Sequence, residues 1–415
     1  MKTLMRASAL ATATAEGRLV HLVAGTRPEA IKIAPIVAEL PRHGLVPVLV
    51  DSGQQPGRVA EALAPFGLSP DVELKIARRD GSLVELMGLI AAAYDARLAS
   101  ERPAAVLVQG DTTTALAAGL VAHLRRIDLV HLEAGLRTHD RDNPFPEETN
   151  RRLIADLADV HLAPTDCAAA ALVAEGHSRD RIVVTGNTVV DALLQLLPNA
   201  RLRAESSQLR REAAGADGQH LVVTVHRREA WGAGVRAVAH TVADLLASHP
   251  RLHASVVTHP NPDVARDVVS VLQGVERCRL LPPQPYDDML ALLTTADVVL
   301  TDSGGIQEEA PTIGVPVVVA RYATERPEGV AAGWAELAGL EPGRLNAAVS
   351  RALRSTQTGG AVRALGANPY GDGHAAARAG AALNWLVNDG PRPGDWLAPH
   401  EADYRRAGSA AVASS

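Results

Sequence analysis

Cysteine, aromatic residues and long apolar runs are all scarce in this sequence of 415 residues. Its two cysteines, Cys167 and Cys278, lie far apart and show no metal-ligand spacing, which predicts buried, reduced thiols rather than a disulfide framework. No apolar stretch reaches the length of a transmembrane helix without a charge or a turn residue, and the first residues lack the apolar core of a signal peptide. We therefore expect a protein of the cytoplasm with no membrane partner.

Clusters of basic residues with interleaved aromatics are also missing, and the formal net charge is −6. Both observations argue against nucleic acid as a partner. What the chain does have is 47% hydrophobic and 21% charged residues, a balance typical of a folded globular protein. Its length exceeds one ordinary core, so we expect two domains of about 150–200 residues each.

One local pattern recurs along the chain: a short apolar run, a turn with glycine and charged residues, and then a segment with helical spacing. Such runs are "LVHLVAG", "AAVLVQG" and "DLVHLEAG" in the first half and "HLVVTVH", "LHASVVTH", "ADVVLTDS" and "VPVVVARY" in the second. Fully apolar strands that alternate with helices predict parallel sheets covered on both faces. We expect the α/β class, with two Rossmann-like domains that face each other across a central cleft.

Domain limits follow from where this pattern stops and restarts. We predict a ragged leader over residues 1–18, a first domain over 19–187, a second over 188–366, and a polar tail over 389–415 whose last part frays. In the first domain, "RRLIADLADVHL" predicts a helix that shares one buried face among Leu153, Ile154, Leu157 and Val160.

Six polar residues share one place in the pattern, because each lies at the end of an apolar run: Arg27, Asp111, Glu133, His226, His259 and Ser303. In open parallel sheets, ligands bind beyond the carboxyl ends of the strands. Each residue alone is more often a cap or a turn residue, but six in one register favour a ligand site. Glu147 joins Asp111 and Glu133 as a third acid, at a helix start, and three acids at one edge allow divided acid–base roles.

The stretch "LTDSGGIQEEAPTIGVP", residues 300–316, combines a strand end, a glycine pair and a helix start. Gly304 and Gly305 let backbone approach a ligand closely, and the N–H groups of the first helical turn favour an anion such as a phosphate. Glu308 or Glu309 then lies where a carboxylate can take the two hydroxyls of a ribose. A capped helix with acids near its positive end explains the same residues, and glycine spacing does not decide between the two.

Two further motifs place arginine at candidate positions. In "GTRPEAIK", Pro28 opens a helix, and Arg27 suits either a diphosphate or a surface ion pair. In "TVHRREAWG", Arg227 follows His226, and no second histidine lies at metal-ligand spacing. We expect no metal site, and we expect no nicotinamide cofactor because no dinucleotide glycine fingerprint follows the first strand.

A collinear series of motifs from about residue 19 to 388 resembles the non-hydrolysing UDP-N-acetylglucosamine 2-epimerases of bacteria. The motifs are "GTRPEAIKIAPI", "QGDTTT", "HLEAGLRT", "PEETNR", "VTGNTVVDAL", "HRRE", "DSGGIQEEAP", "TERPEG" and "NPYGDG". The resemblance implies the GT-B fold, in which a C-terminal helix, here within residues 367–388, crosses back onto the first domain. It also implies an isomerase of carbohydrate biosynthesis that acts on a UDP-sugar without any cofactor. We further expect a homodimer.

In that family UDP is eliminated to leave a 2-acetamidoglucal, and UDP is then added back with C2 inverted. Breaking the anomeric C–O bond builds oxocarbenium character, which acidifies the C2–H enough for a carboxylate to remove it. The positions that match the family's catalytic residues are Asp111, Glu133, Glu147 and His226. The positions that we assign to UDP-sugar binding are Arg27, Lys32, Arg137, Arg227, His259, Ser303, Gly304, Gly305, Glu309 and Arg326.

The match departs from the family at one corner. After Gln54, Gln55 stands where the family has histidine, and Asp80–Gly81 stand where activatable members have an arginine–glutamine pair. The resemblance implies that a second UDP-GlcNAc activates the family there, so we expect either no activation or a modified sugar substrate. Three other interpretations remain: a hydrolysing 2-epimerase that releases UDP and ManNAc, a glycosyltransferase of the same fold, and a catalytically silent nucleotide-sugar-binding protein.

Overall fold

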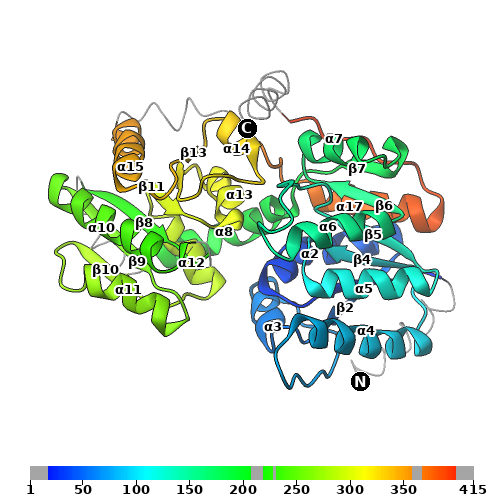
Figure 1. Ribbon diagram of the computed structural model, residues 1–415. Coiled ribbons are helices and arrows are strands. Elements are labelled where there is room, and N and C mark those ends of the chain that lie inside the picture. Colours follow the sequence, from blue (N-terminus) through cyan, green and yellow to red (C-terminus); the bar gives the residue numbers. More distant parts are fainter. Residues whose placement is uncertain (1–16, 207–217, 228–229, 358–366, 399–415) are drawn as a thin grey trace. The chain divides into compact units, whose positions relative to one another are not determined.

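The chain divides into two compact units in the computed structural model, which describes residues 17–206, 218–227, 230–357 and 367–398. Unit 1 comprises the described residues up to Ala192 together with Tyr370–Ala398, and unit 2 comprises those from Leu193 to Pro369. Figure 1 shows that each unit is a sheet with helices packed on it. Most of the expected leader, and the expected tail beyond residue 398, lie outside the described residues.

Unit 1 is built on a seven-stranded sheet in the order β3-β2-β1-β4-β5-β6-β7, and all neighbouring strands are parallel. Every residue of β1 and β4 is buried, because helices cover both faces of the sheet. The strands are β1 (Leu19–Ala24), β2 (Val46–Asp51), β3 (Val72–Glu73), β4 (Ala105–Gln109), β5 (Asp128–Leu132), β6 (Val160–Ala163) and β7 (Ile182–Val184).

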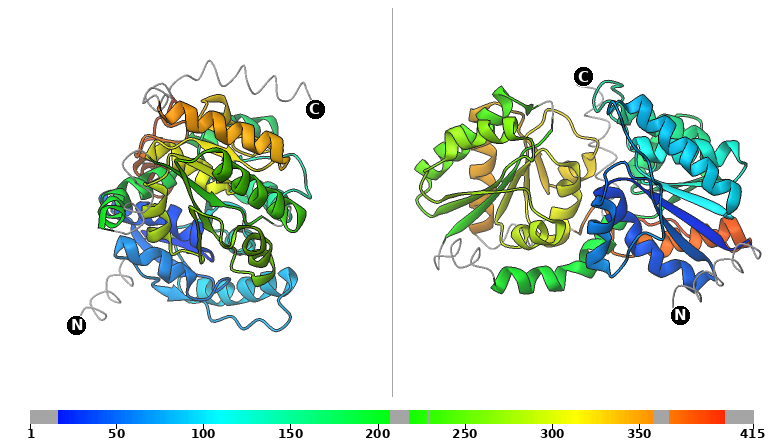
Figure 2. Two further views of the ribbon diagram at one scale, coloured as in Figure 1. Left: turned by 90° about the vertical axis from the view of Figure 1, so that its left-hand side faces the viewer. Right: turned by 90° about the horizontal axis from the view of Figure 1, so that it is seen from below.

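The helices of unit 1 form two layers. In the right-hand view of Figure 2, α4 and α5 (blue to cyan) cover one face of the sheet, while α2 (dark blue) and α17 (orange) cover the other. Thr112 caps α5, because its hydroxyl accepts the amide hydrogen of Ala115, and Ser82 caps α4 in the same way. The helices are α2 (Arg27–Glu39), α3 (Arg58–Leu63), α4 (Leu83–Ser100), α5 (Thr113–Leu124), α6 (Glu147–Leu157), α7 (Asp166–Ala174) and α17 (Ala375–Asn388).

Unit 2 has a six-stranded parallel sheet in the order β10-β9-β8-β11-β12-β13. One apolar cluster packs α10, α11 and α15 on one face, and a second packs α12 and α13 on the other. The strands are β8 (Gln219–Thr224), β9 (Leu252–Val257), β10 (Cys278–Leu281), β11 (Val298–Thr301), β12 (Val317–Val319) and β13 (Ala335–Leu337). The helices are α10 (Ala233–Ser248), α11 (Pro262–Leu272), α12 (Tyr286–Leu293), α13 (Gly304–Ile313), α14 (Pro327–Ala331) and α15 (Pro342–Gln357), and α8 (Thr188–Ser206) crosses the boundary between the units.

Both sheets therefore have the doubly wound strand order, and the predicted class of two Rossmann-like α/β units is confirmed. In such a sheet the chain winds in opposite directions from one central strand pair, and ligands bind at the carboxyl ends of that pair. The pair is β1 and β4 in unit 1, and β8 and β11 in unit 2. The polar residues that follow these strands are thus placed where the fold leaves room for a ligand.

The C-terminal segment belongs to unit 1, where α17 packs against α2. Asp191 caps α17, because its carboxylate accepts the amide hydrogens of Ala375 at 3.2 Å and Ala376 at 2.9 Å. Beyond the helix, the described part of the expected tail is packed: Asp395 accepts the amide hydrogen of Val184 at 2.8 Å, and Trp396 is buried. These contacts return the chain to the unit in which it began.

Two local expectations from the sequence are wrong. In α6, Ile154 is buried as expected, but Leu153 is 46% exposed and Val160 lies beyond the helix, in β6. The helix instead buries polar residues, because these pair with the loops of the sheet edge. The second error concerns Cys167 and Cys278, which the sequence predicts to be buried but which are only half-buried.

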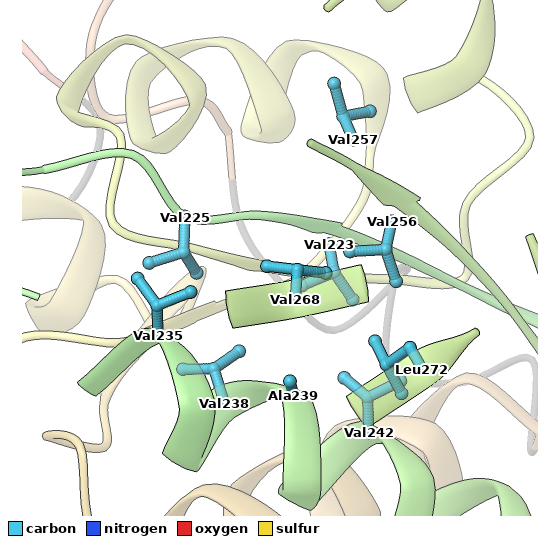
Figure 3. Close-up of a pocket in the computed structure, with 10 residues that line it drawn as sticks. All are labelled: Val223, Val225, Val235, Val238, Ala239, Val242, Val256, Val257, Val268 and Leu272. Atoms are coloured by element: carbon cyan, nitrogen blue, oxygen red, sulfur yellow. The ribbon is translucent and has the colours of Figure 1, made fainter. Parts of the chain in front are cut away.

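An apolar pocket lies in unit 2 among β8, β9, α10 and α11 (Figure 3). Its cavity volume is only about 10 Å³, and valine, alanine and leucine side chains alone line it. A ligand site normally combines an apolar surface with a few polar groups that orient the ligand. This pocket is lined by no polar side chain, so the polar edges of the two sheets are the better candidates for a ligand site.

Candidate active site

Glu133 directly follows β5 and has its backbone in the left-handed region, with φ at 64°. That conformation costs about 1–2 kcal/mol for a residue with a Cβ, and such residues concentrate at functional sites. Two donors hold its carboxylate: Lys32 Nζ lies 2.5 Å from Oε2, and the side-chain amide of Gln109 donates to the same oxygen. Lys32 and Glu133 are both buried, so the protein holds this acid in one direction at the edge of the sheet.

Asp111 follows β4 and is held by α6. Arg151 Nε lies 2.7 Å from Asp111 Oδ2, and Asn150 Nδ2 donates to the backbone carbonyl of Asp111 at 2.8 Å. The same guanidinium reaches the buried carboxylate of Glu148 at 3.2 Å. The polar face that α6 buries therefore positions this candidate acid.

Glu147 is the first residue of α6 and is half-buried. Its neighbour Glu148 accepts the backbone amide hydrogens of Thr138 at 3.0 Å and His139 at 3.2 Å, which ties the loop after β5 to the start of α6. Since α6 also holds Asp111, these ties bring the three predicted acids to one edge of unit 1.

The sequence analysis missed Glu29, a buried acid at the same edge of the sheet. Its Oε2 accepts from the Gly25 amide at 3.0 Å and from Thr26 Oγ1 at 2.8 Å, and its Oε1 accepts from Thr112 Oγ1 at 2.6 Å. It thereby joins the turn after β1 to the turn that carries Asp111. Burial raises the pKa of Glu29 to about 7. The signal in the sequence was the Thr26-x-x-Glu29 spacing of a capping box, which explains only the bonds within its own turn.

Replacing Glu29 with glutamine is expected to remove a pH dependence of stability. The folded pKa of about 7 lies above the usual 4.5, so the native protein holds a proton that the unfolded chain has already released. The contribution of this group to the free energy of unfolding is therefore fully present below pH 4.5 and is lost as the pH rises to about 7. Urea unfolding measures the free energy of unfolding at about pH 5 and about pH 8. Between these two values it should fall less in the variant than in the natural protein. Equal losses in the two proteins would contradict this.

The basic candidates of unit 1 differ in their surroundings. Arg27 is exposed at the first residue of α2, whereas Lys32 is buried further along the helix and bonded to Glu133. Arg137 is turned toward Glu175, with Nε at 2.8 Å from Oε1 and a terminal nitrogen at 2.6 Å from Oε2. Because a carboxylate of the same unit occupies its planar fork, none of the described contacts of Arg137 supports the predicted role in substrate binding.

In unit 2, His226 follows β8 and is anchored by Asp302, which follows β11. The fully buried Asp302 carboxylate accepts the amide hydrogens of His226 at 2.9 Å and Arg227 at 2.8 Å, and His226 Nδ1 lies 3.3 Å from Asp302 Oδ1. The His226 side chain is 44% exposed, so the histidine is held by its backbone and offers its ring to the surface. Sequence analysis missed Asp302 although it stands next to Ser303.

Helix α13 begins at Gly304, and its N-cap residue Ser303 makes no side-chain capping bond. The first-turn amides of a helix have no partners within the helix and can bind an anion. A Cβ at 304 would lie 2.5 Å from a terminal nitrogen of Arg326, so a larger residue there would have to displace that guanidinium. Gly305 follows in the same turn, and Arg326 thus lies against the start of α13.

A network of buried ion pairs surrounds this helix start. Arg326 Nε lies 2.6 Å from Glu308 Oε1, and a terminal nitrogen of Arg326 lies 2.6 Å from Glu325 Oε1. Arg321 also pairs with Glu325, at 3.0 Å, and Arg227 approaches it at 3.3 Å. Three guanidinium groups thus meet two carboxylates beside the first turn of α13, and guanidinium groups are common partners of phosphate.

Two remaining candidates of unit 2 have milder contacts. Glu309 is buried and accepts a hydrogen bond from the Tyr286 hydroxyl at 3.2 Å. His259, after β9, contacts the ring of Trp231 edge-on, with ring centres 5.5 Å apart, and its Nδ1 accepts the amide hydrogen of Asn261 at 2.9 Å. Burial lowers the pKa of His259, so its ring is neutral near physiological pH.

Within the described ranges, no group of three or more His, Cys, Asp or Glu side chains is placed to hold a metal ion. The expectation that no cofactor is needed stays a prediction. No helix in the described part of the chain has the length and apolar character to cross a membrane. The expected cytoplasmic location also stays a prediction.

Comparison with known proteins identifies relatives over most of the chain. The family model described as UDP-N-acetylglucosamine 2-epimerase matches residues 38–384. The UDP-N-acetylglucosamine 2-epimerase of Escherichia coli K12 is 40% identical over 361 residues, which cover 86% of this chain and 96% of the relative. The protein of the same name from Neisseria meningitidis serogroup A is 36% identical over 356 residues, covering 85% of this chain and 95% of the relative. The family suggested by the sequence motifs is confirmed.

Solved structures are also similar to this chain over most of its length. The S. aureus MnaA–UDP co-structure is 33% identical with a TM-score of 0.84, and the match covers 92% of this chain and 100% of that one. The crystal structure of UDP-GlcNAc 2-epimerase from Neisseria meningitidis bound to UDP-GlcNAc is 35% identical with a TM-score of 0.79, covering 86% of this chain and 97% of that one. By their names, both of those structures hold a uridine nucleotide.

Proposed function

This chain belongs to the UDP-N-acetylglucosamine 2-epimerase family, and from that premise we propose that it inverts C2 of UDP-N-acetylglucosamine to give UDP-N-acetylmannosamine. The observation that carries the proposal is Glu133, a buried acid in left-handed backbone that Lys32 holds at the carboxyl end of β5. A carboxylate with a fixed direction suits proton transfer at a defined atom. Its left-handed backbone lowers stability, and residues with such backbone strain are common at active sites.

The proposed reaction is an elimination followed by an addition. A carboxylate removes the C2 proton, the electron pair of that bond forms the C1–C2 double bond of a 2-acetamidoglucal, and UDP leaves with the electrons of the anomeric C–O bond. UDP then adds back to C1 while C2 receives a proton on its opposite face. Inversion therefore needs proton-handling groups for both faces, and Asp111, Glu133 and Glu147 are the acids that we propose for these steps.

Unit 2 supplies the groups that we propose for the nucleotide. The start of α13 suits the diphosphate, since it offers helix amides where charge accumulates as UDP leaves, and Arg326, held by Glu308 and Glu325, adds positive charge beside this turn. Glu309 suits the ribose, because a buried carboxylate can accept hydrogen bonds from two neighbouring hydroxyls. His226, with its exposed ring on an anchored backbone, suits a contact with the phosphates.

Incubation with UDP-GlcNAc in deuterated water tests the proposal. We expect deuterium at C2 of a sugar that is still attached to UDP, because the proton removed at C2 exchanges with solvent before a new one is delivered. The E133Q variant serves as the control and should incorporate deuterium at least about 10²-fold more slowly. Release of free ManNAc and UDP would indicate a hydrolysing enzyme instead, and an unchanged substrate that binds would indicate a silent binding protein.

Substrate activation is expected to be absent, so the initial rate should rise hyperbolically with UDP-GlcNAc concentration. Asp80 is exposed, and the amide hydrogen bond from Ser82 at 2.7 Å lowers the pKa of its carboxyl, which keeps it charged. The neighbouring Glu85 carboxylate accepts the amide hydrogens of Arg79 at 2.9 Å and Asp80 at 3.0 Å. Glu85 is paired with Arg79, whose Nε lies 3.4 Å from Glu85 Oε1, so the repulsion of a second diphosphate rests on Asp80.

Initial rates over a wide range of UDP-GlcNAc concentrations provide the measurement. A sigmoidal curve would contradict the expectation. So would conversion of UDP-ManNAc that begins only after UDP-GlcNAc is added, since that requires a working activator site.

A homodimer is a further part of the proposal. Helix α5 exposes Leu120 and Leu124 one turn apart, and α6, which packs against α5, exposes Leu153. Such neighbouring apolar side chains on a surface are typical of an interface. Light scattering should give twice the mass of one chain, and Leu124→Glu should reduce it to the mass of one chain. A natural protein with the mass of one chain would rule the dimer out.

A further inference from the structure

The fully buried His131 in β5 makes a side-chain contact with a neighbouring loop. It lies two residues before Glu133, and its Nε2 is 2.8 Å from the backbone carbonyl oxygen of Gly110, the residue before Asp111. A carbonyl oxygen only accepts hydrogen bonds, so Nε2 carries the hydrogen and donates it. The histidine on the strand that ends at Glu133 is therefore bonded to the loop that carries Asp111.

The ring of His131 stays neutral at physiological pH. Burial lowers its pKa to about 4. The hydrogen bond to Gly110 and the charge of Asp111 act in the opposite direction, and the charges of Arg137 and Arg151 add to the lowering. Nδ1 of His131 has no hydrogen-bond partner among the described residues, and a buried polar atom without a partner costs about 1–3 kcal/mol. An apolar side chain would avoid that cost, so this position gives up stability to present the Nε2–H donor.

The bond acts on the orientation of Asp111. The carbonyl of Gly110 and the amide of Asp111 belong to one planar peptide group, so holding the carbonyl oxygen fixes the direction in which Asp111 leaves the turn. Gly110 has a φ of +68°, a conformation that favours glycine, and its own amide donates to the carbonyl of Leu132 at 2.9 Å. The next carbonyl, that of Asp111, is held by Asn150. Side chains therefore hold the peptide groups on both sides of this acid.

We infer that His131 is a positioning residue for the reaction: through the Gly110 carbonyl it orients Asp111, and from its place on β5 it sets the spacing between Asp111 and Glu133. This inference rests on the proposed function, in which both acids handle protons. It assigns no proton transfer to the imidazole itself. Misplacing a catalytic group by about 1 Å can cost about 10²-fold in rate, so a single such bond is sufficient to matter.

Two substitutions at His131 show whether the hydrogen bond to Gly110, rather than the bulk of the side chain, is what the reaction needs. In His131→Gln the side-chain nitrogen lies the same number of bonds from Cα as Nε2 and still donates to Gly110, whereas His131→Met has similar length and no donor. We expect the glutamine variant to keep turnover within about threefold and the methionine variant to lose about 10²-fold in kcat with little change in KM. The dependence of kcat on pH should keep its shape in the glutamine variant, because the natural ring does not titrate in the working range.

Equal loss in the two variants would overturn the inference, because it would show that the imidazole is needed for more than a hydrogen bond. Full activity of the methionine variant would overturn it as well. His220→Met is the control for general damage: His220 is also a buried strand histidine with hydrogen bonds, to Thr295 and Ser255, and its loss should reduce stability without reducing kcat.

Amide hydrogen exchange tests the bond without any substrate. The amides of Gly110 and Asp111 should exchange faster in His131→Met than in His131→Gln. If the natural protein does not epimerise UDP-GlcNAc, the proposed function fails while the exchange result still decides whether the bond holds the loop. Equal exchange in the two variants, or faster exchange with unchanged kcat, would refute the positioning role.

Discussion

Replacing Glu133 with glutamine is expected to reduce the turnover of UDP-GlcNAc by roughly 10²–10⁴-fold, the usual worth of one positioned proton-transfer group. Glutamine has the shape of glutamate and still offers an oxygen to Lys32, but it cannot take up a proton. UDP affinity should stay nearly unchanged, because the residues that we assign to the nucleotide in unit 2 are not altered. Turnover and UDP affinity are measured on the same preparation.

A matched acid shows whether the loss is specific. Glu39 lies on the same helix as Lys32 and is also paired with a basic residue, Arg42, at 2.9 Å. Glu39→Gln should change turnover by less than about threefold, since pairs with an exposed partner contribute little. Some fall in melting temperature is expected for Glu133→Gln, because Lys32 then faces a neutral amide. Full turnover in Glu133→Gln would remove this residue from the mechanism.

Replacing Arg326 with methionine is expected to lower the free energy of unfolding by about 3–5 kcal/mol. The reason is that Arg326 bonds both Glu308 and Glu325, whose side chains are each 1% exposed. Methionine would leave Glu308 buried without this partner, and Glu325 would lose one of its arginine partners. Removing one member of a buried ion pair is costly, because the remaining charge cannot reach water. Denaturant unfolding, followed with a probe in unit 2, measures the change.

A surface pair in the same unit is the control. Arg236 lies 2.7 Å from Asp267, and its side chain is 48% exposed. Arg236→Met should cost no more than about 1 kcal/mol, because water and salt screen an exposed pair. UDP affinity separates two roles of Arg326: weaker UDP binding with unchanged stability would mean that it acts as a ligand contact alone, and would contradict the structural role argued from its two carboxylates.

Several site residues could be found only in the folded chain. Lys32 and Glu133 stand 101 positions apart, and Asp111 and Arg151 stand 40 apart, so no local pattern reveals that they meet. Arg137 is a further example. Its motif predicts substrate binding, which stays a prediction, and its contact with Glu175, 38 positions away, is visible only in the folded chain.

Helix α6 shows why periodicity misled. Apolar spacing predicted that Leu153 would face the core, but Glu148 and Arg151 occupy that face. A buried charge is stable only when partners surround it, and these partners come from the loops after β4 and β5. A pattern of apolar residues does not contain this information, because it reports which side chains avoid water and not which polar groups find one another.

The sequence by itself determined the class of the fold, the family and the positions of the candidate acids. Fully apolar runs such as "AAVLVQG" can only be buried on both faces of a sheet, and polar residues at their ends then fall at its carboxyl edge. Only the tertiary structure decided which side chains hold those acids. It placed Lys32 on Glu133, Arg151 on Asp111, and a neutral histidine on the carbonyl of Gly110. The physical reason is that burial is a property of a single residue and its neighbours in sequence, whereas pairing of buried polar groups depends on segments that only the completed fold brings together.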